Sequence, residues 1–255
     1  MGRELARVVH ATEGCILAGG IEAAGSPFIG TDYGSLIGVD ELGVKISSDA
    51  EAVLAKADGV VDFTVPQATL ALVELSARLT KIHVIGTTGI DPAGDVAISR
   101  AAQQTRIVKS GNYSLGINVL QGLVKKVASV LGDEFDIEVL EMHHRHKIDA
   151  PSGTALMLGQ AAADGRQANL KEKSVRVRDG HTGVRKAGDI GFATLRGGAV
   201  IGDHTVMFAS DAERIELTHK AQSRDMFARG AVRAALWAQN QRPGLYDMQD
   251  VLGLK

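Results

Sequence analysis

The chain has 255 residues, of which 28 are Lys or Arg and 30 are Asp or Glu, so its formal net charge is −2. This balance disfavours a nucleic-acid-binding protein, which carries a marked basic excess, and a hydrophobic fraction of 45% disfavours a disordered chain. No apolar run approaches the roughly 20 residues of a membrane span, and the single cysteine, Cys15, cannot form an internal disulfide. We therefore expect a cytoplasmic protein of roughly one to two domains that binds neither nucleic acid nor membrane.

The first half of the chain alternates short apolar runs with helical stretches. Strands are expected over residues 15–21, 59–64, 81–85 and 106–109, and a helix over residues 68–79. Asp91 followed by Pro92 is typical of a helix N-cap with proline at the first helical position. Cys15 is expected to be a small buried residue of the first strand. This alternation predicts βαβ units and a parallel sheet with helices on both faces.

The second half has a different pattern. It begins with a long helix over residues 115–131 and a strand over residues 135–142, and a further helix starts near Ser152. A meander is then expected over residues 175–180, 190–198, 199–210 and 213–221, before a last helix over residues 226–239. We therefore expect an α/β chain with two domains. Residues 1–113 plus 225–255 would form a Rossmann-like doubly wound domain that binds a dinucleotide, and residues 114–224 an α+β substrate domain with an open mixed sheet.

The segment 141–156 (EMHHRHKIDAPSGTAL) is the richest in chemistry. Three histidines, an arginine and a lysine fall within residues 143–147, shortly before a helix begins near Ser152. A helix N-terminus presents N–H groups and partial positive charge, so this arrangement suits a carboxylate- or phosphate-bearing small molecule. A histidine beside a lysine is also a good general acid/base pair. A solvated basic loop followed by an ordinary capped helix is the alternative, and the residues alone do not indicate which histidine acts.

A metal site is a second alternative for the histidines. Alternation at period two would place His144 and His146 on one face of an extended strand. However, no third ligand stands at a recognisable spacing, and an HExxH motif is absent. We expect no metal, and a zinc-dependent hydrolase remains the competing interpretation.

Two features of the first half fit a dinucleotide site. Glu22 ends a strand 20 residues after Gly2, where the dinucleotide fold places the acidic residue that binds the adenosine ribose. Residues 86–89 (GTTG) lie where a parallel strand gives way to a helix, at the edge of the sheet where ligands bind. A polar strand end and a tight turn would look the same. Asp62-Phe63-Thr64 ends a strand on that edge, although Phe63 would also suit the core. Residues 196–198 (RGG) and 202–205 (GDHT) lie in the meander, where hairpin turns explain the glycines at least as well as function does.

These segments together resemble the dihydrodipicolinate reductase family over the whole chain. The resemblance rests on VDFT (61–64), IGTTG (85–89), GNYSLGINV (111–119), EMHHRHKIDAPSGTAL (141–156), RDGHTG (178–183), IGFATLRGG (190–198), GDHTVMF (202–208) and ERIELTHKAQSR (213–224). It implies reduction of 4-hydroxy-tetrahydrodipicolinate, through its dehydrated cyclic imine, to tetrahydrodipicolinate. The hydride would come from NADH or NADPH, in diaminopimelate and lysine biosynthesis. It also implies a homotetramer formed through the sheet of the substrate domain.

The resemblance assigns roles to individual residues. His143 matches the family's proton donor/acceptor and Lys147 its proton-donating lysine. His144, Gly153 and Thr154 match positions that bind the carboxylates of the substrate. Glu22 matches the acidic residue that binds the ribose of the nicotinamide nucleotide. Other positions that contact this nucleotide are matched by Gly86, Thr87, Thr88, Ser110, Gly111, Asn112 and Tyr113.

The sequence departs from the family pattern at its start. The family begins with a strand and a GxxGxxG loop that binds the pyrophosphate, and Met1-Gly2-Arg3 resembles only the tail of that loop. We therefore expect the working protein to be longer by on the order of 15 residues. The alternative is a cofactor-deficient relative that only binds a ligand. Ala23 follows Glu22 where members that use NADPH often carry arginine, which favours NADH. A hinge that closes over both ligands is expected near Tyr113.

Overall fold

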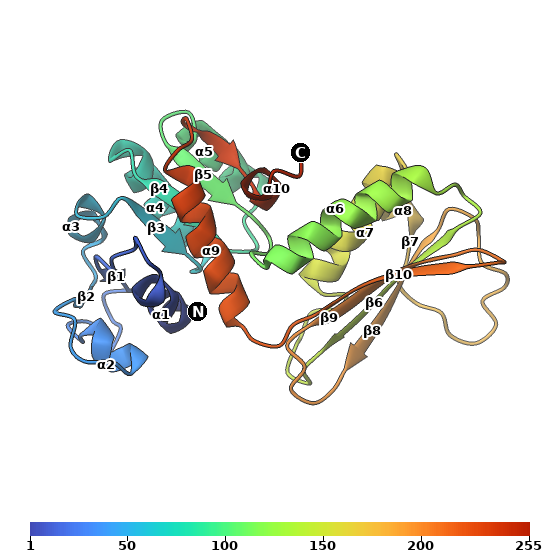
Figure 1. Ribbon diagram of the computed structural model, residues 1–255, viewed down its shortest axis with the longest axis horizontal. Helices are drawn as coiled ribbons and strands as arrows, with labels where there is room; N and C mark the ends of the chain where they lie inside the picture. Colours follow the sequence, from blue (N-terminus) through green and yellow to red (C-terminus); the bar gives the residue numbers. More distant parts are fainter. The chain divides into compact units, whose positions relative to one another are not determined.

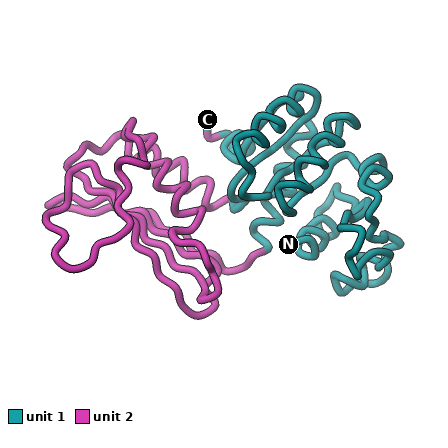
Figure 2. The backbone as a smooth tube through the Cα atoms, turned by 180° about the vertical axis from the view of Figure 1, so that it is seen from behind, with its two compact units in different colours: residues 1–114, 225–253, 255 teal, residues 115–224, 254 magenta.

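The computed structural model describes residues 1–255 and divides into two compact units. Unit 1 comprises residues 1–114, 225–253 and 255, and unit 2 comprises residues 115–224 and 254 (Figure 2). The chain thus leaves unit 1 after Ser114 and re-enters it at Asp225. None of the helices combines the length and the apolar character that crossing a membrane requires.

Unit 1 contains parallel strands and seven helices. The strands are β1 (Gly20–Ile21), β2 (Ile46–Ser47), β3 (Gly59–Asp62), β4 (Ile82–Ile85), β5 (Arg106–Lys109) and β11 (Gly244–Tyr246). The helices are α1 (Gly2–Ala11), α2 (Tyr33–Ile37), α3 (Ala50–Ala55), α4 (Pro66–Arg78), α5 (Pro92–Ala101), α9 (Asp225–Ala238) and α10 (Met248–Leu252). The strands form a four-stranded sheet in the order β11-β5-β4-β3 and a separate pair, β1-β2.

Helices pack on both faces of the four-stranded sheet, as expected for a doubly wound fold (Figure 1). Helices α4 and α5 share an apolar cluster with Ile85 of β4 and Ile107 of β5. Helix α9 packs against β3, β4 and β5, and α1 and α10 pack against α9. Helix α5 begins as predicted, because the Asp91 side chain accepts the backbone N–H of Gly94 and Pro92 occupies the first helical position.

The prediction of a strand over residues 15–21 was wrong for most of its length. Only Gly20 and Ile21 pair, and Ile16 is 90% exposed. Cys15 is half-buried and lies outside any strand, so its expected place in a strand was also wrong. The reason is that β1 has one hydrogen-bonded neighbour, β2, and a short apolar run without partners for its backbone does not remain a strand.

Unit 2 has one mixed sheet with helices on one face (Figure 1). Its strands are β6 (Asp136–His143), β7 (Ser174–Val175), β8 (Ile190–Arg196), β9 (Asp203–Ala209) and β10 (Arg214–Lys220). Its helices are α6 (Leu115–Val130), α7 (Gly153–Gly165) and α8 (Leu170–Lys173). Apolar residues of α6 and α7 pack on the inward side chains of β6, β8 and β9, including Ile137, Phe192 and Phe208.

The expected meander was wrong in its strand order, which is β10-β9-β6-β8-β7. Strands β9 and β10 form an antiparallel hairpin, but β6 lies between β9 and β8 and runs parallel to β8. The expected strand over residues 175–180 shrinks to Ser174–Val175, with Val177 exposed. Strands that follow one another in sequence are readily predicted to pair as hairpins. Strand β6 instead occupies the centre of the sheet, where its inward face is buried under α6 and α7.

Candidate active site

The alternation of β6 determines which side chains form the polar cluster of unit 2. Odd-numbered residues of this strand are buried, so Glu141 and His143 continue the inward face that begins with apolar Ile137. The strand register places His204 of β9 opposite Glu141, and Arg196 of β8 opposite His143. Three strands therefore bring four polar side chains together at the carboxyl end of β6.

Glu141 lies at the centre of this cluster, with a side chain that is 1% exposed. Its carboxylate accepts Arg196 Nη1–H at 2.8 Å and Nη2–H at 2.9 Å. It also accepts the backbone N–H of Ser152 at 2.9 Å and lies 2.6 Å from His143 Nδ1. Burial raises the pKa of Glu141, but the hydrogen bonds from Arg196, His143 and Ser152 outweigh it and hold that pKa below its ordinary value. Glu141 is therefore an ionised acceptor.

The carboxylate fixes how His143 presents its imidazole. Because an ionised carboxylate can only accept, the hydrogen on this edge belongs to His143 Nδ1, which leaves Nε2 as the nitrogen that exchanges a proton. Gly202 borders Nε2 so closely that a Cβ at that position would lie 2.9 Å from it. His143 thus has an orienting partner on one edge and a glycine on the other, an arrangement suited to general acid/base chemistry.

His204 is a neutral member of the cluster. Burial and the nearby His143 lower the pKa of His204 to about 4. Its ring lies edge-on to that of His143, with centroids 5.1 Å apart. Ser152 Oγ accepts the N–H of Ala155 at 3.1 Å and lies 3.2 Å from His204 Nε2. His204 therefore links β9 to the start of α7.

Helix α7 begins beside this cluster, with Ser152 as its N-cap. Gly153 and Thr154 occupy its first two positions, at the helix end that carries partial positive charge. Lys147 Nζ lies 2.8 Å from Asp149 Oδ1, and this contact holds the pKa of Asp149 below its ordinary value. The expected helix start is confirmed. The geometry unites a cation, a helix N-terminus and a general acid/base within one unit, which suits an anionic ligand.

The other two histidines of the basic run lie beyond the end of β6, as the expected end of that strand near Met142 implies. Strand β6 ends at His143, so His144 and His146 lie in a turn rather than on one face of a strand, with ring centroids 6.2 Å apart. Arg224 Nη2 lies 3.4 Å from His144 Nε2. Burial and the charge of Arg224 lower the pKa of His144. No group of three or more His, Cys, Asp or Glu side chains is arranged to hold a metal ion.

The residues expected to contact a nucleotide lie in unit 1, at the carboxyl ends of β4 and β5. Gly86 follows β4 and touches Phe63 so closely that a Cβ would lie 2.4 Å from its ring. Ser110 follows β5, and its hydroxyl donates to the Asn112 carbonyl at 2.8 Å. Tyr113 is 1% exposed and its ring packs against Phe63, with centroids 5.5 Å apart, so its phenol is not available to a ligand.

Three further expected residues leave room for the nucleotide. Thr88 is exposed, a Cβ at Gly111 would meet nothing within 4 Å, and the Glu22 side chain is exposed at the end of β1. Exposed backbone at the carboxyl edge of a parallel sheet and an exposed carboxylate at the end of β1 fit a dinucleotide.

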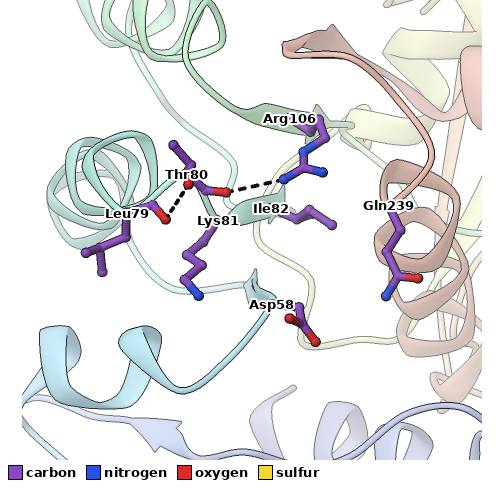
Figure 3. A pocket seen from close by; sticks show the side chains of 7 residues that line it. All are labelled: Asp58, Leu79, Thr80, Lys81, Ile82, Arg106 and Gln239. Atoms are coloured by element: carbon purple, nitrogen blue, oxygen red, sulfur yellow. Dashed lines mark hydrogen bonds between the residues drawn. The ribbon is translucent and has the colours of Figure 1, made fainter.

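A hollow of about 400 Å³ lies elsewhere in unit 1 (Figure 3). Its lining residues are Asp58, Leu79, Thr80, Lys81, Ile82, Arg106 and Gln239. It opens at the amino ends of β4 and β5, whereas parallel sheets bind ligands at the carboxyl ends. Arg106 Nη2 donates to the Thr80 carbonyl at 3.3 Å, and Lys81 Nζ to the Ala55 carbonyl at 3.4 Å. We therefore do not assign the site to this hollow.

Sequence reasoning missed Glu141, Arg196, His204 and Arg224 as members of the site. Arg196 precedes two glycines and was interpreted as part of a hairpin turn, and His204 lies in a segment interpreted the same way. A period-two count from Ile137 places Glu141 and His143 on one face, and that signal was available. No signal in the sequence indicated the pairing of β6 with β8 and β9, which brings Arg196 and His204 to Glu141.

Comparisons with known proteins agree with this architecture. The family model described as Dihydrodipicolinate reductase, N-terminus, matches residues 1–113, and that described as Dihydrodipicolinate reductase, C-terminus, matches residues 116–252. The chain belongs to the dihydrodipicolinate reductase family. It is 59% identical over 254 residues to the 4-hydroxy-tetrahydrodipicolinate reductase of Rhodopseudomonas palustris (strain BisB18), covering 100% of this chain and 94% of the relative.

Further members of the family give the same picture. The chain is 57% identical over 255 residues to the reductase of the same name from Brucella melitensis, covering 100% of this chain and 95% of the relative. A solved structure described as dipicolinate-bound dihydrodipicolinate reductase from Paenisporosarcina sp. TG-14 shares the fold. Its TM-score is 0.74 at 21% identity, and the alignment covers 98% of this chain and 94% of that one. The resemblance inferred from the motifs is confirmed, as is the fold class.

Proposed function

We propose that this chain reduces 4-hydroxy-tetrahydrodipicolinate, through its dehydrated cyclic imine, to tetrahydrodipicolinate with NADH or NADPH as reductant, in diaminopimelate and lysine biosynthesis. Its family is one of nicotinamide-nucleotide-dependent oxidoreductases, and its relatives carry the name of this reaction. The observation that carries the proposal is the buried Glu141–His143 pair next to Lys147 and the N-terminus of α7. That cluster supplies a proton donor together with anion-binding groups.

The substrate carries two carboxylates, and unit 2 offers groups to bind them. Gly153 and Thr154 lie at the start of α7, and His144 follows β6. Arg224, from the segment before α9, has its Nη2 3.4 Å from His144 Nε2. Backbone N–H groups at a helix start and a guanidinium are both favourable partners for a carboxylate. We assign the carboxylates of the substrate to these positions. Binding there also orients the ring, and orientation can lower a barrier by roughly 7–11 kcal/mol.

Reduction of the conjugated imine leaves carbanion or enamine character on the ring, which must receive a proton. We assign the transfer to His143 and Lys147. His143 has its Nδ1 directed at Glu141, so Nε2 is the atom that gives or takes a proton. Lys147 Nζ contacts Asp149, whose side chain is 55% exposed, so a bound anion can displace this partner. General acid catalysis by such a group accelerates a reaction by about 10²–10⁴.

The nicotinamide nucleotide, when bound, supplies the hydride. We assign its binding to the turns formed by residues 86–88 and 110–113, and the ribose to Glu22. Glu22 is followed by Ala23, and no arginine stands at that position to receive a 2′-phosphate. We therefore expect NADH to be preferred over NADPH. The ratio of kcat/KM for the two nucleotides tests this, and a clear preference for NADPH would contradict it.

The outer face of the unit 2 sheet supports the expected homotetramer. Helices α6 and α7 cover the inner face, whereas Leu195 on the outer side is 48% exposed. A sheet face without a covering layer is a place for another subunit to pack. We propose that four chains associate through it in the cytoplasm. Light scattering of the purified protein tests the association, and a monomer at micromolar concentration would contradict it.

The decisive experiment follows nicotinamide absorbance after adding the product of condensing pyruvate with aspartate semialdehyde. Oxidation of NADH that depends on this substrate supports the proposed function. Binding of the dicarboxylate with neither nucleotide binding nor turnover would favour the cofactor-deficient ligand-binding relative. Stoichiometric zinc with hydrolytic activity would favour the zinc-dependent hydrolase.

A further inference from the structure

A buried polar network lies in unit 1, on the α4 side of the four-stranded sheet. Asp62 ends β3 and is 2% exposed, while His83 of β4 and Thr69 of α4 are fully buried. Burying a carboxylate costs free energy unless charge partners and hydrogen bonds compensate. The proton-transfer chemistry assigned to unit 2 uses none of these groups, so their presence in a domain core calls for another role.

The Asp62 carboxylate connects strand β4 to the loop that follows β3. One carboxylate oxygen, Oδ2, lies 3.3 Å from His83 Nε2. The other, Oδ1, accepts the backbone N–H of Thr64 at 2.9 Å and its hydroxyl at 2.6 Å. Burial raises the pKa of Asp62, and the hydrogen bonds from His83 and Thr64 more than offset it, so the group stays ionised. On the other edge of His83, away from Asp62, Nδ1 lies 3.2 Å from Ser76 Oγ.

The network ends on Thr87, the central residue of the turn after β4. Thr87 Oγ1 accepts the hydroxyl of Thr69 at 2.7 Å and the backbone N–H of Thr64 at 3.1 Å. It lies 3.5 Å from Asp62 Oδ1, the acceptor for its own proton. Thr87 is therefore fixed from α4, from the loop after β3 and from Asp62. The loops that follow two neighbouring strands, β3 and β4, are thus joined through the buried side chains of Asp62, Thr69 and Thr87.

We propose that Asp62, with His83 as its hydrogen-bond partner, and Thr69 are positioning residues that hold residues 86–88 in the conformation that receives the nicotinamide nucleotide. This assignment rests on the proposed function, because that function places the nucleotide at this turn. A turn fixed before binding loses less conformational freedom when the ligand arrives, so the network acts on affinity for the nucleotide. It leaves the dicarboxylate site in unit 2 unchanged.

The test compares Thr69→Val and Asp62→Asn with two controls. Thr69→Val keeps the shape of the side chain and removes the hydroxyl that Thr87 accepts, and Thr69→Ser restores that hydroxyl. Ser76→Ala is the matched control, because it removes another buried hydroxyl of α4 from the far side of His83. Fluorescence titration gives the Kd for NADH and NADPH. Hydrogen exchange in the ligand-free protein reports the Thr64 amide, which the network binds directly.

Thr69→Val and Asp62→Asn are expected to raise the nucleotide Kd roughly threefold to tenfold and to speed exchange of the Thr64 amide. The KM for the dicarboxylate stays the same, and Thr69→Ser and Ser76→Ala bind as the wild type does. Equal Kd values for wild type, Thr69→Val and Asp62→Asn would overturn the assignment. An equal rise in Ser76→Ala would also overturn it, since the network would then act only through stability. Wild-type protein that binds neither nucleotide would contradict the proposed function itself.

Discussion

Glu141→Gln is the substitution that most directly tests how the cluster in unit 2 works. The carboxylate accepts four hydrogen bonds, from both Nη atoms of Arg196, from His143 Nδ1 and from the Ser152 amide. Glutamine keeps the shape but has one oxygen, and its NH2 group faces donors. Breaking a buried pair costs about 3–5 kcal/mol. Because the Arg196 side chain is 21% exposed and can bind water, we expect a loss of about 2–3 kcal/mol of unfolding free energy.

The fall in kcat should be larger than the loss of unfolding free energy alone would cause. Without an ionised acceptor, His143 no longer has its hydrogen fixed on Nδ1, so Nε2 is not held ready for proton transfer. We expect kcat to fall by about 10²–10³, within the range that general acid catalysis supplies. The KM for NADH should stay the same, because Glu141 lies in unit 2 and the nucleotide is assigned to unit 1. Steady-state kinetics of NADH oxidation and urea unfolding measure the two effects.

Glu138→Gln provides the matched control. Glu138 lies on the same strand and accepts hydrogen bonds from two arginines, Arg178 and Arg185, but its side chain is on the other face of β6. Its loss should lower stability and leave kcat near the wild-type value. A folded Glu141→Gln protein with wild-type kcat would refute the role given to Glu141. Equal losses of kcat in both variants would show that the effect is not specific to the cluster.

Three other predictions concern the same cluster. His143→Gln and Lys147→Ala should each lower kcat by about 10²–10⁴ in NADH oxidation while circular dichroism stays unchanged, and near-normal rates would remove both from proton transfer. Gly202→Ala would place a Cβ 2.9 Å from His143 Nε2. We therefore expect kcat to fall at least about tenfold, and the free energy of unfolding measured in urea to fall by about 1–3 kcal/mol. An unaltered kcat would show that Nε2 is not the reacting atom. His204 is buried and neutral, with a pKa of about 4 in the folded protein, below its unfolded value near 6.5. Between these pH values the unfolded state binds the extra proton, so the free energy of unfolding falls as pH drops from 6.5 to 4, by about 3 kcal/mol in total. In His204→Gln, urea unfolding at both pH values should show this loss reduced, and an identical loss would contradict the assignment.

Local features of the sequence determined where the main elements begin. Asp91-Pro92 and Ser152 start α5 and α7 through side-chain caps, which depend on a few neighbouring residues. The motif around His143 to Thr154 identified the family and the start of α7. The apolar runs at β4 and β5 predicted parallel strands, because a strand buried on both faces needs such a run.

Tertiary structure alone decided the composition of the buried clusters. The partners of Glu141 stand 2, 11 and 55 residues away, and they meet because β6 lies between β8 and β9. The partners of Asp62 come from β4 and from the loop after β3. The run at residues 15–21 has the composition of a strand, yet only its last two residues pair. In each case hydrogen bonds between distant segments decide the outcome, and a single sequence does not state which segments become neighbours.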